Sequence, residues 1–130
     1  MLQLQGFHHV ALIVSDYEKS KDFYTRILGL QIISEHFREE RQSYKLNLAL
    51  PNGDELELFS FPDPPPRPSY PEAAGLRHLA FKVANVAQSH QALVNEGIIP
   101  QEIRIDPYTG KKFFFFADPD DLPLEIYQVD

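Results

Sequence analysis

The chain carries the same order of strand and helix patterns twice, and this repetition limits the folds that it can adopt. In the first half, alternating apolar residues predict a strand over 6–14, and Ser15 or Asp16 can cap the helix that follows. Gly29 is expected to end that helix, because glycine accepts the left-handed conformation found just past a helix end. Three further strands are expected, at about 30–37, 43–50 and 54–61.

The second half restarts after a proline-rich stretch, residues 62–75, which holds six of the eleven prolines. Proline lacks the amide hydrogen that a sheet requires, so this stretch is expected to be an extended linker. A strand over 76–83 follows, and then a helix that Asn85 can cap and Gly97 can end. The last three strands are expected at about 98–105, 111–117 and 122–128.

These patterns predict a single α+β domain over residues 1–130, in which a first βαβββ module (5–61) and a second (76–128) flank the linker. The net charge of −7 argues against nucleic acid or an anionic membrane as a partner, because both require a basic surface. The chain has no cysteine, which excludes a disulfide and a thiolate metal site. No membrane span or signal peptide is apparent, so we expect a cytoplasmic protein.

Two histidines and two glutamates occupy matching places in the two modules. Superposing the modules at an offset of 68 or 69 residues aligns His9 with His78, and Glu57 with Glu125. Successive side chains of a strand point to opposite faces, and each of the four residues is out of phase with the branched apolar residues of its strand. Any one of them alone is adequately explained as solvated surface. Their repetition favours a shared site, and two imidazoles with two carboxylates suit Zn, Ni, Co, Mn or Fe.

Four stretches of the chain together resemble the vicinal oxygen chelate superfamily, the fold of glyoxalase I and of fosfomycin-resistance proteins. They are HHVALIVSDYEKSKDFYTRILGL, ELELF, GLRHLAFKV and DPDDLPLEIYQ, and the resemblance covers essentially the whole chain. It implies that the two βαβββ modules form a cupped mixed sheet around one divalent metal ion. In this family the ligands come from the first and last strands of each module, which implies the ligands His9, Glu57, His78 and Glu125.

The resemblance also implies a reaction. In glyoxalase I the metal stabilises an enediolate while a ligand glutamate moves a proton between adjacent carbons, so Glu125 is the expected base and Glu57 the alternative. The glutathione site of that enzyme uses an arginine and an asparagine at places where this chain has Ile13 and Phe61. We therefore expect a lactoylglutathione lyase-like lyase or isomerase whose small substrate has vicinal oxygens but is not a glutathione adduct.

Two other functions within the superfamily are alternatives. Members that sequester drugs or antibiotics bind them in the same cup without metal, and a non-catalytic binding or resistance protein is therefore possible for this chain. Extradiol dioxygenases use two histidines and one carboxylate on iron, with open positions for oxygen. A fourth ligand at Glu57 would occupy a position that a dioxygenase needs.

Positive side chains in the second module carry two interpretations. Arg104 and Lys111 lie near a turn at 108–110, where the family lines the mouth of its cavity; they are either surface charges or ligands for an anionic substrate group. The four phenylalanines 113–116 cannot all face one side of a strand, so two are expected under the helix and two in the cup or at a chain–chain interface. This apolar surplus favours a homodimer.

Overall fold

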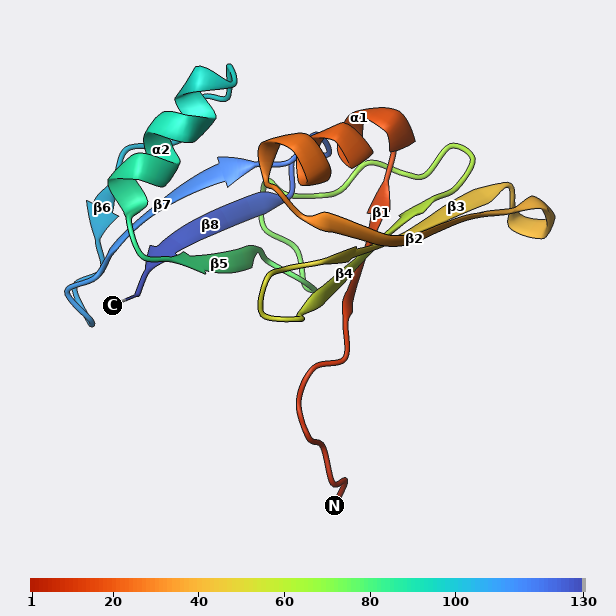
Figure 1. Ribbon diagram of the computed structural model, residues 1–130, viewed down its shortest axis with the longest axis horizontal. Coiled ribbons are helices and arrows are strands. Elements are labelled where there is room, and N and C mark those ends of the chain that lie inside the picture. Colours follow the sequence, from red (N-terminus) through yellow and green to blue (C-terminus); the bar gives the residue numbers. More distant parts are fainter. Residues whose placement is uncertain (130) are drawn as a thin grey trace. The chain divides into compact units, whose positions relative to one another are not determined.

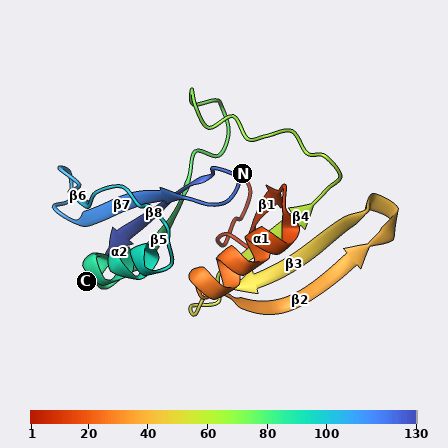
Figure 2. The ribbon, with the colours of Figure 1, turned by 90° about the horizontal axis from the view of Figure 1, so that it is seen from above.

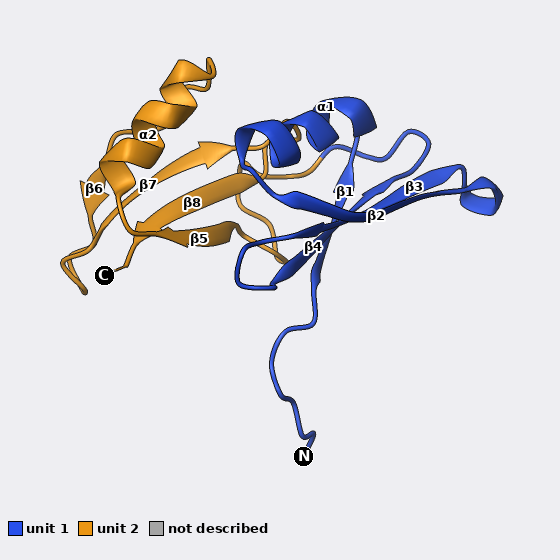
Figure 3. Cartoon of the chain, viewed as in Figure 1, with its two compact units in different colours: residues 1–66 blue, residues 67–130 orange. Residues whose placement is uncertain are grey.

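The computed structural model describes residues 1–129, which form two compact units divided after Pro66 (Figure 3). The first unit contains a helix that continues as a π-helical turn, a short 3₁₀ turn and four strands: β1 (Val10–Val14), α1 (Tyr17–Asp22), η1 (Phe23–Ile27), β2 (Gln31–Arg38), η2 (Glu39–Arg41), β3 (Ser43–Ala49) and β4 (Glu55–Ser60). The second contains one helix and four strands: β5 (Leu79–Val83), α2 (Val86–Asn95), β6 (Arg104–Ile105), β7 (Lys112–Ala117) and β8 (Pro123–Gln128).

The strand order confirms the repetition predicted from the sequence. The first sheet has the order β1-β4-β3-β2 and the second the order β5-β8-β7-β6. In both sheets the first strand of the module pairs in parallel with the last one: β1 with β4, and β5 with β8. All the other strand pairs are antiparallel. The chain is therefore an α+β protein of two four-stranded mixed sheets, as expected (Figure 1).

The helix of each unit covers one face of its own sheet, and both views of the ribbon show this (Figures 1 and 2). In the first unit Leu46, Leu48 and Leu58 have no exposed surface, and they alternate with polar residues along β3 and β4. Fully burying one such side chain stabilises the fold by about 1.5–3 kcal/mol relative to leaving it exposed. The opposite face of each sheet remains available for a site.

Two of the four consecutive phenylalanines lie under α2, as predicted. Phe114 and Phe116 are 0% and 5% exposed, whereas Phe113 and Phe115 are half-buried on the other face of β7. The Phe114 ring meets the His90 ring of α2 edge to face, with 4.9 Å between the centroids. The alternation along β7 therefore fixes which phenylalanines belong to the core.

Equivalent side chains cap the two helices. The Asp16 carboxylate accepts a hydrogen bond from the Lys19 amide at 3.1 Å, and the Asn85 side chain accepts one from the Gln88 amide at 3.0 Å. Each bond satisfies a donor that the first helical turn leaves unpaired. Gly97 follows α2 with a φ of 82°, which permits the bond from the Ile98 amide to the Leu93 carbonyl. The caps and the end of α2 were predicted correctly.

Three predicted strands are shorter in the structure. The first strand of each module begins later than expected, at Val10 and at Leu79, so His9 and His78 each lie immediately before their strand. The strand predicted over 98–105 is reduced to two residues. Pro100 has no amide hydrogen to give to a neighbouring strand; before β6 begins, the Gln101 amide donates to the Phe115 carbonyl of β7.

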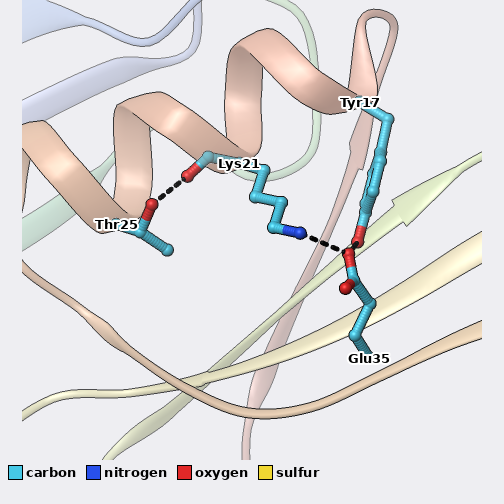
Figure 4. A network of polar contacts seen from close by, with 4 residues as sticks. All are labelled: Tyr17, Lys21, Thr25 and Glu35. Atoms are coloured by element: carbon cyan, nitrogen blue, oxygen red, sulfur yellow. Dashed lines mark hydrogen bonds and ion pairs between the residues drawn. The ribbon is translucent and has the colours of Figure 1, made fainter.

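A polar network joins α1 to β2 in the first unit (Figure 4). Lys21 donates to the Glu35 carboxylate at 2.8 Å, and the Tyr17 hydroxyl donates to the same carboxylate oxygen. These two hydrogen bonds, with that of Lys21 the larger cause, lower the pKa of Glu35. Burial and the Glu35 hydrogen bond raise the pKa of Tyr17, whose ring stacks on Tyr44 of β3 with 4.2 Å between centroids. The network therefore fixes the helix on its sheet.

None of the helices among residues 1–129 is long and apolar enough to cross a membrane.

Candidate metal-binding site

The first unit brings His9 and Glu57 together on the face of its sheet opposite α1. Ala11, two residues beyond His9, is the register partner of Glu57 in the parallel β1–β4 pair. The His9 Nε2 atom lies 3.6 Å from the Glu57 Oε1 atom. The imidazole is 38% exposed but the carboxylate side chain only 8%, so Glu57 is not the solvated surface residue that its strand pattern alone would allow.

The second unit repeats this arrangement with His78 and Glu125. Ala80, two residues beyond His78, is the register partner of Glu125 in the parallel β5–β8 pair. The His78 Nε2 atom lies 3.3 Å from the Glu125 Oε1 atom, and the two side chains are 25% and 14% exposed. Each unit therefore holds one imidazole nitrogen beside one carboxylate oxygen, at the positions that the sequence predicted.

Asn47 supports the first pair, and the sequence analysis missed it. It lies on β3 directly across from Glu57, and its side-chain amide donates to the Glu57 Oε2 atom at 3.1 Å. The corresponding place on β7, across from Glu125, is occupied by Phe115, whose ring meets the His78 ring edge to face at 5.1 Å. One glutamate is therefore oriented by an amide, while the other has only its histidine as a polar partner among the described residues.

The two histidines also differ at their second ring nitrogen. The His9 Nδ1 atom lies 2.9 Å from the His8 Nδ1 atom, so His8 can accept a hydrogen bond from the Nδ1–H group of His9. In that tautomer the Nε2 atom of His9 is free to bind a metal. The Nδ1 atom of His78 instead lies 3.1 Å from the Arg77 guanidinium, which can only donate. His78 must therefore lose its contact with Arg77 before its Nε2 atom can act as a ligand.

The donor set suits a divalent ion, but neither pair is complete by itself. Imidazole and carboxylate are ligands for Zn, Ni, Co, Mn and Fe, and a catalytic site usually takes at least three protein ligands. Within residues 1–129, no group of three or more histidine, aspartate or glutamate side chains is gathered closely enough to hold a metal ion. Each pair by itself therefore supplies two of the three or more protein ligands that such a site needs.

The family model for the "Glyoxalase/Bleomycin resistance protein/Dioxygenase superfamily" matches residues 6–126, which is nearly the whole chain. The chain belongs to this superfamily. This result confirms the family resemblance of the four sequence stretches and is consistent with the order of the strands in both sheets.

Two of the relatives are uncharacterized proteins and a third is an epimerase. The chain is 58% identical to the uncharacterized protein YwkD of Bacillus subtilis (strain 168) and 52% identical to the uncharacterized protein YaeR of Escherichia coli (strain K12). These matches cover 96% and 98% of this chain, and 98% and 99% of the relatives. A 2-epi-5-epi-valiolone epimerase from Actinomyces sp. is 27% identical over 94% of this chain and 78% of the enzyme.

Solved structures agree with the fold. The crystal structure of SMU.1112c superposes with a TM-score of 0.91 at 50% identity, covering 96% of this chain and 99% of the other. The fosfomycin resistance protein FosX from Listeria monocytogenes, in complex with Mn(II) and sulfate, superposes with a TM-score of 0.74. At 18% identity, over 98% of this chain and 95% of FosX, that likeness concerns the fold alone.

Of the four residues that the sequence predicted near a substrate, Ile13 and Phe61 lie in the first unit, and Arg104 and Lys111 in the second. Ile13 is 60% exposed on β1, and Phe61 follows β4 with the Arg41 guanidinium 4.9 Å from its ring centroid. Arg104 lines a cavity of the second unit, and Lys111 is not among the residues that line it. No amide or guanidinium that could hold glutathione stands at positions 13 or 61.

The cavity has a volume of about 300 Å³ and lies wholly within the second unit. Three arginines from two segments of the chain line it: Arg67, Arg77 and Arg104. Of these, the sequence analysis selected only Arg104. The other two belong to the irregular chain before β5, where no periodic pattern indicates the direction of a side chain.

Proposed function

We propose that His9, Glu57, His78 and Glu125 together bind one divalent metal ion, and that the chain is a metal-dependent lyase or isomerase. The observation that carries this proposal is the repetition of a histidine–glutamate pair at equivalent register positions of both sheets, at 3.6 and 3.3 Å. The two pairs would meet within one chain or across a homodimer. The ion would be Zn, Ni, Co, Mn or Fe, and Mn(II) in FosX is an example of a metal in the same fold.

The substrate would be a small carbonyl or 2-hydroxycarbonyl compound with two adjacent oxygens. When bound, a divalent ion acts as a Lewis acid and stabilises the negative charge that develops on such oxygens when a neighbouring carbon loses a proton. Epimerisation at a carbon is the activity named for the Actinomyces relative, which supports this reaction class. Ile13 and Phe61 replace the groups that would bind glutathione, so a glutathione adduct would be a poor substrate.

Glu125 would be the residue that takes the proton and returns it to the adjacent carbon. A carboxylate that moves a proton must change its position and partners during the reaction, and Glu125 has fewer constraints than Glu57. Asn47 donates to the Glu57 carboxylate, which is 8% exposed, whereas among residues 1–129 Glu125 has His78 as its polar partner and lies across from Phe115. Glu57 would thus remain an oriented ligand while Glu125 reacts.

A non-catalytic binding protein is the second candidate, and one observation favours it. The Arg77 guanidinium donates to His78, and this contact places the proton of a neutral His78 ring on Nε2, the atom that a metal would need. If that contact persists in solution, the second unit offers one carboxylate and no imidazole. The chain would then bind a small molecule without metal.

Elemental analysis of the purified protein after reconstitution separates the two candidates. We expect wild type to retain one divalent ion and the His9→Ala and Glu125→Gln variants to lose it, while His36→Ala, a matched control in β2, retains it. Incorporation of solvent deuterium into a panel of hydroxycarbonyl compounds would then report the proton transfer. Full metal retention in both site variants, or a wild type that binds none, would contradict the proposal.

A further inference from the structure

We infer that the cavity of the second unit binds the anionic group, a carboxylate or a phosphate, of the small molecule that this protein recognises. That this small molecule is a substrate rests on the proposed function, whereas the binding of an anion in the cavity does not depend on it. The cavity volume of about 300 Å³ is at the lower end of the range for small-molecule sites.

The cavity gathers more positive than negative charge. Arg67, Arg77 and Arg104 line it, together with the carboxylates of Glu72 and Asp121. Among the described residues, no carboxylate lies within ion-pairing distance of any of the three guanidiniums. Three guanidiniums that share a cavity with two carboxylates, neither of which forms an ion pair with them, leave an excess of positive charge, and a bound anion would offset that excess.

Two of the arginines are held in place before any ligand arrives. Arg67 donates to the Ser69 hydroxyl at 2.8 Å and to the backbone carbonyls of Leu76 and Arg77, which fixes the chain that forms one wall. The Arg104 guanidinium lies 5.0 Å from the Phe113 ring centroid and 5.9 Å from that of Phe115. One Arg104 N–H group donates to the Gln101 side-chain oxygen at 3.4 Å, and stacking of this kind orients the planar guanidinium while its other N–H groups remain available to an anion.

The third arginine connects the cavity to the proposed metal ligand His78. Arg77 precedes His78 in the chain and donates to its Nδ1 atom, while the Phe115 ring borders both the cavity and the His78 ring. An anion in the cavity offers Arg77 a charged acceptor, which forms a stronger hydrogen bond than a neutral imidazole. Transfer of Arg77 to the anion would release the His78 ring for metal binding, so metal and anion would each strengthen the binding of the other.

This position narrows the chemical class of the ligand. The anionic group would lie beside His78, and therefore within a few bonds of the oxygens that approach the metal. The best fit is a small hydroxycarbonyl acid or its phosphate ester, in which the charged group and the vicinal oxygens belong to the same short molecule. The apolar part of the cavity, which includes Ile99, Phe115 and Phe116, leaves room for a short carbon skeleton.

The test uses the full chain in metal-free form, with inorganic phosphate and malonate as probes of the two anion types. Backbone amide resonances of the second unit would be followed during titration at constant ionic strength. We expect saturable shifts centred on the cavity, and a loss of affinity of about tenfold or more in both Arg104→Gln and Arg77→Gln. Lys112→Gln removes the same charge from β7 outside the cavity and should change the affinity less than twofold.

The titrations with phosphate and malonate either support or overturn the anion site. Saturable binding by phosphate alone or by malonate alone assigns the anion type, whereas absence of saturable binding by either probe overturns the inference. An equal loss in Lys112→Gln also overturns it, because a diffuse surface charge would then be responsible. Metal content is measured on separate portions of the same proteins after reconstitution with a divalent ion. If the protein binds the anion but no metal, the proposed function is wrong and the anion site stands. If it binds metal but neither anion, the anion site is wrong and the proposed metal site stands.

Discussion

The two units contain the same histidine–glutamate pair in different surroundings. In the first unit Glu57 receives a hydrogen bond from Asn47, and His9 contacts a second histidine. In the second unit Glu125 faces Phe115, with no such amide, and the His78 ring contacts an arginine. The same fold thus holds the Glu57 pair by more polar contacts than the Glu125 pair. Under the proposed function, Glu57 would be the fixed ligand and Glu125 the mobile base.

Removal of either histidine should have the largest effect on metal affinity. His9→Ala and His78→Ala should each weaken metal binding by more than about 100-fold, since loss of a ligand costs more than the 10–100-fold typical of an outer partner. Competition with a coloured chelator would measure both constants. An effect confined to one variant would show that a single unit binds the metal and that the repetition has no functional meaning.

Loss of the amide beside Glu57 should have a smaller effect. Asn47→Leu keeps the volume but removes the hydrogen bond to the Glu57 carboxylate, and should weaken metal binding by about 10–100-fold. The exposed Asn52→Leu, in the turn between β3 and β4, is the matched control. The chelator competition applies here also, and an unchanged affinity in Asn47→Leu would mean that Asn47 does not orient a ligand.

The reciprocal change gives the second unit the amide of the first. Phe115→Asn places a donor across from Glu125, and we expect it to slow proton transfer by about tenfold through restraint of the base while leaving the metal bound. Deuterium incorporation into an active hydroxycarbonyl compound would report the rate, and elemental analysis the metal. Faster exchange in the variant would contradict the assignment of Glu125 as the mobile residue.

Half of this comparison could be predicted from the sequence. Strand parity, its repetition in both modules and the family resemblance together selected His9, Glu57, His78 and Glu125 from the sequence, and the structure places each histidine beside its glutamate. Asn47 was accessible in principle, since it lies between Leu46 and Leu48 and faces Glu57 once the register of the hairpin is known. The register depends on the turn between them, which the pattern locates only approximately.

The cavity could not be predicted from the sequence, and of the three strands predicted too long the one over 98–105 differs most from the structure. Residues 67–77 bring Arg67 and Arg77 to the cavity through irregular backbone, which has no period from which to read a direction. The stretch was therefore treated only as a linker. Similarly, the apolar residues of 98–105 predict a strand, but Pro100 prevents most of the pairing.

The smallest expected effect concerns stability in acid and is specific to the first unit. Because the pKa of Glu35 is lowered by Lys21 and then by Tyr17, its contribution to stability is present above the usual value near 4.5 and is lost as the pH falls through the folded-state pKa. Glu35→Gln should therefore cost less than about 1 kcal/mol at pH 7, since the pair is partly exposed, and the difference from wild type should shrink below pH 4.5.

Urea unfolding at a series of pH values measures this difference. Glu40→Gln, at an exposed carboxylate of η2, is the control and should show a smaller dependence on pH. A difference between Glu35→Gln and wild type that grows as the pH falls would contradict the network in which Glu35 is ionised and held by Lys21.

The central claim is that the two dissimilar pairs form one metal site, and the stoichiometry of metal binding tests it most directly. Metal-free wild type would be titrated with Co(II), with isothermal calorimetry and the visible spectrum of the bound ion as readouts. The account predicts one ion per chain, bound in a single step. Two ions per chain would show that each pair acts alone, and no binding would show that His9, Glu57, His78 and Glu125 do not form a metal site.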